Sequence, residues 1–189
     1  MYGLVNKAIE QLVCRDFGRE AWERMRERAE IDVPGFISME AYDDDITYRL
    51  VAAGTEVLGL PAEAILKAFG EYWISYTAEE GYGSLLSSFG DTLEEFLDQL
   101  NSLHSRAALT LTHLKPPQFR LEQEKDGGIL LHYQSTRKGL APMVVGLLHG
   151  LAKRFETTCE VEHLGPTDDA GEQLFRLRIA SETPVAEAS

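Results

Sequence analysis

His104 and three polar residues about thirty positions after it are the side chains most suited to chemistry. His104 lies on the apolar stripe of an expected helix, where its ring nitrogens must be satisfied by hydrogen bonds or by a metal ion. Tyr133, Ser135 and Arg137 occupy alternate positions of an expected strand, so their side chains share one face. A phenol, a hydroxyl and a guanidinium together offer donors suited to carboxylates. The pattern therefore predicts one metal ligand and one carboxylate-binding segment.

Both features also have plainer interpretations. A histidine in an apolar stripe is more often a core residue with hydrogen-bonded nitrogens, and polar residues are common on the solvated face of a strand. A single histidine is nevertheless enough protein ligation for a heme iron, because the porphyrin supplies the other nitrogens. A zinc site built from several protein ligands is poorly supported, because no two-ligand spacing occurs among the remaining histidines, His113, His132, His149 and His163.

The first half of the chain is expected to be helical, because apolar residues recur at helical spacing over 4–13, 21–29, 46–60 and 62–77. Pro61 suits the first turn of the last of these helices. A break rich in glycine and serine is expected at 81–90. A single helix over 92–109, begun by a capping box of Asp91 and Glu94, then carries His104. Pro116 and Pro117 end the helical part.

The second half changes to the period of strands. Segments 119–124 and 129–136 flank a turn at 125–128 and predict a hairpin, a helix follows over 141–155, and two more strands are expected at 156–164 and 173–181. The fold class is therefore α+β, with an antiparallel sheet of roughly four strands. We expect one domain over 1–182, made of a helical lobe (1–60) and a second lobe (61–182), followed by a disordered tail at 183–189.

Composition narrows the class of partner. The chain has 189 residues, of which 44% are hydrophobic, and a net charge of −13. Such a chain can bury a core, but its field repels phosphate backbones and anionic membrane surfaces, so neither nucleic acid nor membrane is expected as a partner. The two cysteines imply no disulfide framework. Neither a signal peptide nor an apolar run of about 20 residues occurs, so a cytoplasmic location is expected.

Several segments together resemble the heme nitric oxide/oxygen-binding (H-NOX) family, which includes the heme domain of the soluble guanylate cyclase β subunit. The resemblance extends to about residue 180, and the family's Tyr-x-Ser-x-Arg motif is met by Tyr133, Ser135 and Arg137. An upstream histidine, His104, stands in the expected place. The segments that carry the resemblance are MYGLVNKAI, EAYDDDITYRLV, FGEYWISYT, EEGYGSLL, LNSLHSRAALTL, LKPPQF and HYQSTRKGLAPMVVGLLHGL.

The resemblance implies a role for each of these residues around a heme b. His104 would be the proximal iron ligand, and Tyr133, Ser135 and Arg137 would bind the heme propionates. Pro117 would press on the porphyrin and hold it out of plane. One of the acids at 43–45, most simply Asp44, would pair with Arg137 and join the two lobes. The plainer interpretation of these acids is a helix N-terminus that favours negative charge.

The distal side of the implied heme pocket decides which gas is bound. Oxygen-binding members of the family place a tyrosine hydroxyl there, whereas the matching position here is Met143, or Pro142 if the helix shifts by one residue. Neither side chain can donate a hydrogen bond. The resemblance also places Trp73 in the distal pocket with Val5 nearby. A mostly apolar pocket predicts a sensor that binds nitric oxide and carbon monoxide and discriminates against dioxygen.

Alternatives remain open at this stage. An oxygen-binding sensor would follow if the indole N–H of Trp73, or one of the neighbouring Tyr72 and Tyr76, served as a distal donor, although both phenols are expected to pack in the core with the hydroxyl at the surface. A module that keeps the fold without heme is a second alternative. A heme enzyme is disfavoured, because no distal acid, base or arginine is found near Met143. As the effector, the resemblance implies a separate histidine kinase or cyclic-di-GMP enzyme.

Overall fold

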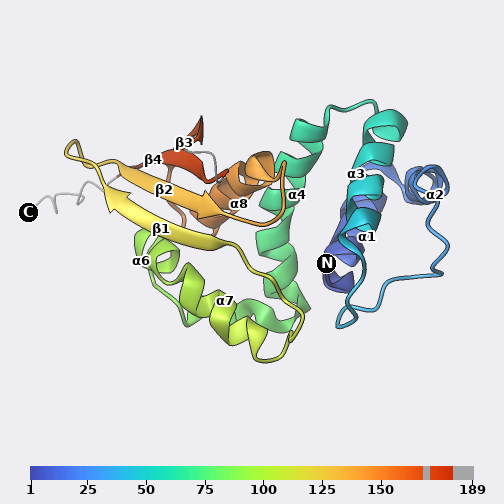
Figure 1. Cartoon of the computed structure of the whole chain (residues 1–189), viewed down its shortest axis with the longest axis horizontal. Helices are drawn as coiled ribbons and strands as arrows, with labels where there is room; N and C mark the ends of the chain where they lie inside the picture. Colours follow the sequence, from blue (N-terminus) through green and yellow to red (C-terminus); the bar gives the residue numbers. More distant parts are fainter. Residues whose placement is uncertain (168–170, 181–189) are drawn as a thin grey trace, which may run out of the picture.

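A four-stranded antiparallel sheet stands at one end of the molecule and a bundle of helices at the other, with two packed helices between them (Figure 1). The computed structural model describes residues 1–167 and 171–180, so the tail predicted at 183–189 lies outside the described residues. The α+β class is confirmed. Among the described residues, no helix combines the length and apolarity needed to cross a bilayer. The helices and strands run in the order α1 (Gly3–Phe17), α2 (Arg19–Arg28), α3 (Asp44–Leu58), α4 (Ala62–Thr77), η1 (Ala78–Tyr82), α5 (Gly83–Ser87), α6 (Leu93–Asp98), α7 (Leu100–Ala108), β1 (Gln118–Gln123), β2 (Ile129–Gln134), α8 (Ala141–Arg154), β3 (Cys159–Pro166) and β4 (Gln173–Ile179).

The helices α1, α2 and α3 pack around their own apolar core. Trp22 and Met25 of α2 and Leu50 of α3 are almost fully buried there. The Asp43 carboxylate caps α3 by accepting from the Asp45 N–H, and Gly59 ends this helix in the left-handed conformation. The connection from α2 to α3 runs back along the start of α1, where Tyr2 and Ala41 form an isolated antiparallel bridge. This bridge fixes the start of the chain beside the start of α3.

The sheet has the strand order β1-β2-β4-β3. The predicted hairpin joins β1 to β2, with Gly127 in the left-handed region and a hydrogen bond from the Glu124 N–H to the Gly128 carbonyl. Alternate residues of β2 are buried, including Ile129 and Leu131. These residues form a second core with α6 and α8.

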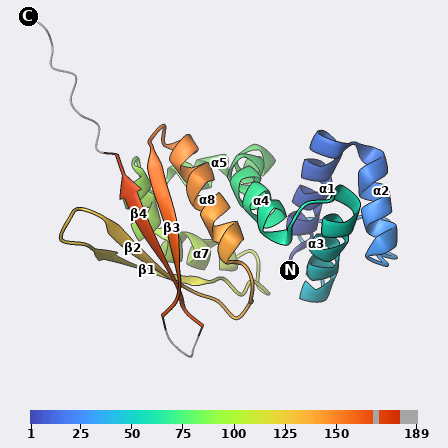
Figure 2. The same cartoon turned by 90° about the horizontal axis from the view of Figure 1, so that it is seen from above.

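The helices α4 and α8 pack so closely that their backbones touch, and Figure 2 shows them side by side between the bundle and the sheet. A Cβ built on Gly70 of α4 would overlap the Met143 carbonyl oxygen, and a Cβ on Gly146 of α8 would overlap that of Lys67. Glycine is therefore required at both positions. The helix α4 supplies side chains to both cores, so the lobe boundary predicted near residue 60 stays a prediction.

The single helix predicted over 92–109 is wrong, because the chain bends at Gln99 into α6 and α7. This bend lets α6 bury Phe96 and Leu97 under the sheet, whereas α7 runs in a different direction and has no fully buried residue. The cap is Thr92, one residue later than predicted: its hydroxyl accepts from the Glu95 N–H. The expected break at 81–90 is also partly helical, since it contains α5.

Only Tyr133 of the three alternate polar residues lies within a strand, so the prediction that Ser135 and Arg137 share that strand is wrong. The ladder partners of β2 end at the same level, with Gln118 on β1 and Gln173 on β4. Beyond this level the described residues provide no neighbouring strand, and the chain leaves the sheet in a loop. Arg137 therefore donates to distant parts of the chain, at Asp44 and Lys115, whereas Ser135 accepts the nearby Arg137 backbone N–H.

Candidate functional site

A cavity of about 1400 Å³ lies between the helical bundle and the sheet. It exceeds the roughly 300–1,000 Å³ typical of small-molecule pockets. Its wall is mostly aliphatic and aromatic and is drawn from α1, α3, α4, α7 and α8. All eight residues predicted to form the site line it: Val5, Trp73, His104, Pro117, Tyr133, Ser135, Arg137 and Met143.

His104 lies on α7 in this wall, among Leu100, Leu103 and Ala107. Burial lowers the pKa of its imidazole to about 4, so the ring is neutral at physiological pH. Its Nδ1 is buried without a hydrogen-bond partner among the described residues. The plainer interpretation of a hydrogen-bonded core histidine is therefore not met. A neutral imidazole without competing partners is in the state that binds a metal.

The ring of His104 stacks on Phe119, with centroids 5.8 Å apart and an interplanar angle of 22°. The ring of Phe119 in turn packs against that of Tyr133, with the ring centroids 5.5 Å apart. Phe119, near the start of β1, lines the cavity, and it was not predicted from the sequence as a site residue. The motif Pro-Pro-Gln-Phe offered a sign, since an aromatic residue two positions after a helix-ending proline pair falls at the first positions of the next strand.

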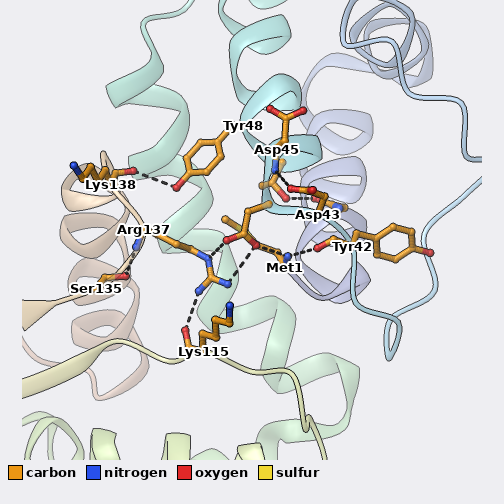
Figure 3. A network of polar contacts seen from close by, with 12 residues as sticks. Met1, Tyr42, Asp43, Asp45, Tyr48, Lys115, Ser135, Arg137 and Lys138 are labelled. Atoms are coloured by element: carbon orange, nitrogen blue, oxygen red, sulfur yellow. Dashed lines mark hydrogen bonds and ion pairs between the residues drawn. The ribbon is translucent and has the colours of Figure 1, made fainter.

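Arg137 forms the polar rim of the cavity together with Tyr133 and Ser135. Its Nε and Nη2 donate to Asp44 at 2.7 and 3.3 Å, and its Nη1 donates to the Lys115 carbonyl at 2.9 Å. Figure 3 shows the guanidinium reaching from the loop after β2 toward the start of α3. Three of its five N–H donors are engaged, which leaves two for a further acceptor. The expected pair between Asp44 and Arg137 is thus present.

Asp44 also receives a hydrogen bond from the Met1 amine, at 2.5 Å. Burial acts to raise the pKa of Asp44, but the hydrogen bonds from Arg137 and from the amine outweigh it and hold the pKa below its ordinary value. The acid at the N-terminus of α3 therefore serves both as a helix-start charge and as an ion-pair partner. The contribution of Met1 was not predicted, because a backbone amine has no sequence pattern.

The remaining rim residues also keep donors. Ser135 accepts the Arg137 backbone N–H through its Oγ, at 3.1 Å, and a hydroxyl that accepts in this way can still donate its own hydrogen. Tyr133 is 6% exposed, and burial raises the pKa of its phenol, which therefore stays protonated and able to donate. The chain thus presents a phenol, a hydroxyl and a shared guanidinium at one edge of the cavity.

The opposite wall is formed by α1, α4 and the start of α8. Trp73 packs on Phe69 with centroids 5.9 Å apart, and both line the cavity with Val5 and Met143. Of the two positions considered for a distal hydroxyl, Met143 lines the cavity and Pro142 does not. This wall is apolar, in agreement with the expectation from the sequence.

Tyr72 and Tyr76 do not line this cavity. The Tyr72 hydroxyl donates to Gln11 at 3.2 Å. The expectation that the Tyr76 hydroxyl lies at the surface is wrong: the side chain is 1% exposed, and its oxygen has no hydrogen-bond partner among the described residues. Its burial raises its pKa to about 12. The ring packs against Trp73 and Tyr72, and this aromatic stacking explains why it is enclosed.

These residues fit a heme. The cavity offers an apolar space larger than most ligands need, with a neutral imidazole in one wall whose Nδ1 has no hydrogen-bond partner among the described residues. Hydrogen-bond donors gather at one edge, where the carboxylates of an amphiphilic ring would lie. The fold and the site together have the features of a class of protein that binds a flat, apolar, carboxylate-bearing cofactor.

Comparison with known proteins agrees with this class. Residues 2–163 match the family described as Haem-NO-binding. The chain is 38% identical over 162 residues to soluble guanylate cyclase gcy-35 of Caenorhabditis elegans, an alignment covering 84% of this chain and 23% of that protein. It is 44% identical over 96 residues to the β-2 subunit of guanylate cyclase of Rattus norvegicus, covering 51% of this chain and 14% of the subunit. The chain thus spans about a quarter or less of the length of these relatives.

Solved structures show the same fold. A mutant H-NOX protein from S. oneidensis in the Fe(II) ligation state superimposes with a TM-score of 0.87 at 18% identity, covering 96% of this chain and 97% of that one. An Fe(II) H-NOX protein from K. algicida gives a TM-score of 0.83 at 19% identity, covering 97% and 98%. The chain belongs to the Haem-NO-binding (H-NOX) family of heme-based gas-sensing domains.

Proposed function

We propose that this domain senses nitric oxide, and also binds carbon monoxide, at a ferrous heme b held by His104, and that it discriminates against dioxygen. The observation that carries the proposal is the imidazole of His104, which is neutral, faces the cavity and has no hydrogen-bond partner at Nδ1 among the described residues. When bound, the heme would supply the iron that takes the gas. Every other step belongs to the residues of the chain.

His104 would hold the iron through Nε2, since Nδ1 is enclosed. Histidines that ligate metals almost always donate their other N–H to a carboxylate or carbonyl, which makes the ring a stronger ligand. His104 lacks such an acceptor among the described residues, so it is a comparatively weak ligand. A weakly held imidazole would suit a sensor of nitric oxide, because His104 could then be released from the iron when the gas binds.

The rim residues would hold the heme carboxylates. Tyr133 and Ser135 each keep a hydroxyl donor, and Arg137 keeps two N–H groups beside those that it gives to Asp44 and Lys115. Pro117 lines the cavity on the same side as Phe119 and would press on the porphyrin face. Because Asp44 stands at the start of α3, a movement of Arg137 would be transmitted through their ion pair to the helical bundle.

The distal wall supports discrimination against dioxygen. Bound dioxygen gains from a hydrogen-bond donor, whereas nitric oxide needs one much less. Four of the hydroxyls in the cavity wall already donate to protein acceptors: Thr47 to Asn6, Tyr48 to Lys138, Thr77 to the Trp73 carbonyl and Tyr82 to the Met39 sulfur. Met143 offers no donor at all.

A second candidate, an oxygen sensor, rests on Trp73. Its ring lines the cavity, and its indole N–H donates to no acceptor in the described part of the chain. The two candidates predict different spectra. We expect the reduced protein to ignore dioxygen and to change its absorption with nitric oxide.

The test introduces and removes the donor. Met143→Tyr places a phenol in the distal wall, and we expect it to create dioxygen binding that the unaltered protein lacks. Trp73→Phe should leave the response to both gases unchanged. A stable dioxygen complex in the unaltered protein that Trp73→Phe abolishes would replace the nitric oxide proposal with the oxygen sensor. A protein that takes up no heme would favour a non-heme interaction module.

We propose that the gas signal passes to a separate effector, a histidine kinase or a cyclic-di-GMP enzyme. The relatives are soluble guanylate cyclases, which makes a guanylate cyclase the second candidate. Adding the domain, with and without nitric oxide, to each purified enzyme and measuring its rate distinguishes them. An effect of the domain that depends on the gas identifies the effector.

A further inference from the structure

The side chain of Asn101 on α7 binds the backbone of Phe119 on β1 through both of its polar groups. Its Nδ2 donates to the Phe119 carbonyl at 2.7 Å, and its Oδ1 accepts the Phe119 N–H at 3.0 Å. A primary amide that both donates and accepts in this way satisfies the strand as a neighbouring strand would. Because β1 is an edge strand, these two groups of Phe119 would otherwise face water.

This contact matters because α7 is weakly anchored by other means. No residue of α7 is fully buried, whereas the preceding α6 buries Leu93, Phe96 and Leu97. The two helices meet at the bend at Gln99. Within the described residues, the two bonds of Asn101 are the side-chain hydrogen bonds that join α7 to the sheet. The helix α7 is therefore fixed at its start by the bend, and the Asn101 amide adds directional hydrogen bonds to the partial packing of Leu100 and Leu103 and to the stack of His104 on Phe119.

Asn101 and Phe119 both act on the ring of His104. Asn101 precedes His104 by three residues, so the two side chains are neighbours on one face of α7. Phe119, whose backbone the amide holds, stacks on the imidazole at 5.8 Å. The amide thus fixes the helix that carries the histidine and the aromatic ring that supports it.

We propose that Asn101 is a positioning residue that sets how firmly His104 is held toward the heme iron. This inference rests on the proposed function. While the amide binds Phe119, α7 stays against β1 and the imidazole stays at its stacking distance. When the bonds to Phe119 are lost, α7 is free to turn about the bend at Gln99, and His104 moves away from the cavity with it.

The test uses the heme-loaded protein with three variants. Asn101→Leu keeps the approximate size and removes both hydrogen bonds, Asn101→Asp keeps the acceptor for the Phe119 N–H, and Ser102→Ala is the matched control at an exposed neighbouring position of α7. The two hydrogen bonds between Asn101 and the Phe119 backbone are called the clamp, and the hydrogen-exchange rate of the Phe119 amide reports whether they are formed. The iron–histidine stretching frequency of the ferrous protein reports the position of His104.

We expect Asn101→Leu to speed exchange of the Phe119 amide roughly fivefold to tenfold, as the loss of one hydrogen bond implies. We also expect it to lower the iron–histidine frequency and to raise the fraction of iron released by His104 under nitric oxide. Asn101→Asp should keep the amide protected and give a smaller frequency change. Ser102→Ala should match the unaltered protein in all three measurements.

Two results would overturn the inference and leave the proposed function intact. One is unchanged exchange at Phe119 in Asn101→Leu, which would mean that the clamp is absent. The other is faster exchange with an unchanged iron–histidine frequency, which would mean that the clamp does not position His104. Failure of the unaltered protein to bind heme is visible in its absorption spectrum beforehand, and it would overturn both proposals. If Asn101→Leu does not fold, the frequency in Asn101→Asp decides.

Discussion

The wall that carries His104 and the rim that carries Arg137 face the same cavity with opposite electrostatic character. The wall is apolar, and its one titratable ring is neutral and without a hydrogen-bond partner at Nδ1 among the described residues. The rim is ionic, and Arg137, Asp44 and the Met1 amine bind one another there. The wall leaves a ligand atom available, whereas the rim joins the sheet to the helical bundle.

The difference indicates how one site can both bind and signal. A buried imidazole without a partner is unfavourable by itself, and a bound metal relieves that cost. A part-exposed ion pair is stable without a ligand, but it can exchange partners at little cost in free energy. Binding therefore depends on the wall, and communication with the helices depends on the rim.

The largest effect is expected from removing the His104 side chain from the apolar wall. His104→Gly removes the only protein ligand proposed for the iron, so heme affinity should fall by roughly 100-fold or more. Added imidazole should restore the absorption spectrum, because it can enter the space left by the side chain. His149→Ala, on α8 and away from the cavity lining, is the control and should bind heme normally. Normal spectra for His104→Gly without imidazole would show that another group holds the iron.

A smaller effect is expected from breaking the rim. Arg137→Ala removes charge-assisted hydrogen bonds to Asp44 and should lower the free energy of unfolding by about 1–3 kcal/mol, measured by urea denaturation. Heme affinity should fall as well, but less than in His104→Gly. Arg28→Ala breaks an ion pair with Glu56 that is exposed and confined to the bundle, and should cost about 0–1 kcal/mol. Equal losses of unfolding free energy in the two variants would show that the ion pair at the rim stabilises the protein no more than an ordinary surface pair.

The smallest effect is the dependence of the rim on pH. The pKa of Asp44 is lower in the folded protein, so its stabilisation is present at neutral pH and is lost as the pH falls through that lowered value. The unfolding temperature of the unaltered protein should therefore exceed that of Asp44→Asn near pH 7, and the gap should begin to narrow at about pH 4 and close only below the lowered pKa of Asp44. Asp32→Asn makes a control, because Asp32 forms no ion pair within the described residues. A gap that persists in acid would assign the effect to something other than charge.

The local pattern predicted most helices and strands because their signals are short-range. The four early helices, the hairpin at 125–128 and the helix from Ala141 all follow from periodicity and turn residues. The bend at Gln99 does not, because the stripe from Leu93 to Ala107 continues unbroken through it. Just before the bend, Phe96 packs against Phe155, which comes from a distant part of the chain and which a local pattern does not register.

The candidate site was predicted in its residues but only partly in its contacts. The motif identified His104, Tyr133, Ser135 and Arg137, and all four line one cavity. The sequence could not show that Arg137 leaves the sheet, since that depends on where β1 and β4 end. The Met1 amine and the backbone of Phe119 were missed for a related reason: backbone groups take part without any distinctive side chain.

The contact between α4 and α8 limits how this protein can be engineered. Replacing helical glycine by alanine is a common route to a higher melting temperature, because it restricts the unfolded chain. At Gly70 and Gly146 that route is closed, since a methyl group would collide with the opposing backbone and not with a side chain that can rotate away. Libraries aimed at a more heat-resistant variant should leave both positions fixed and search the solvent-facing residues of α1 and α2 instead.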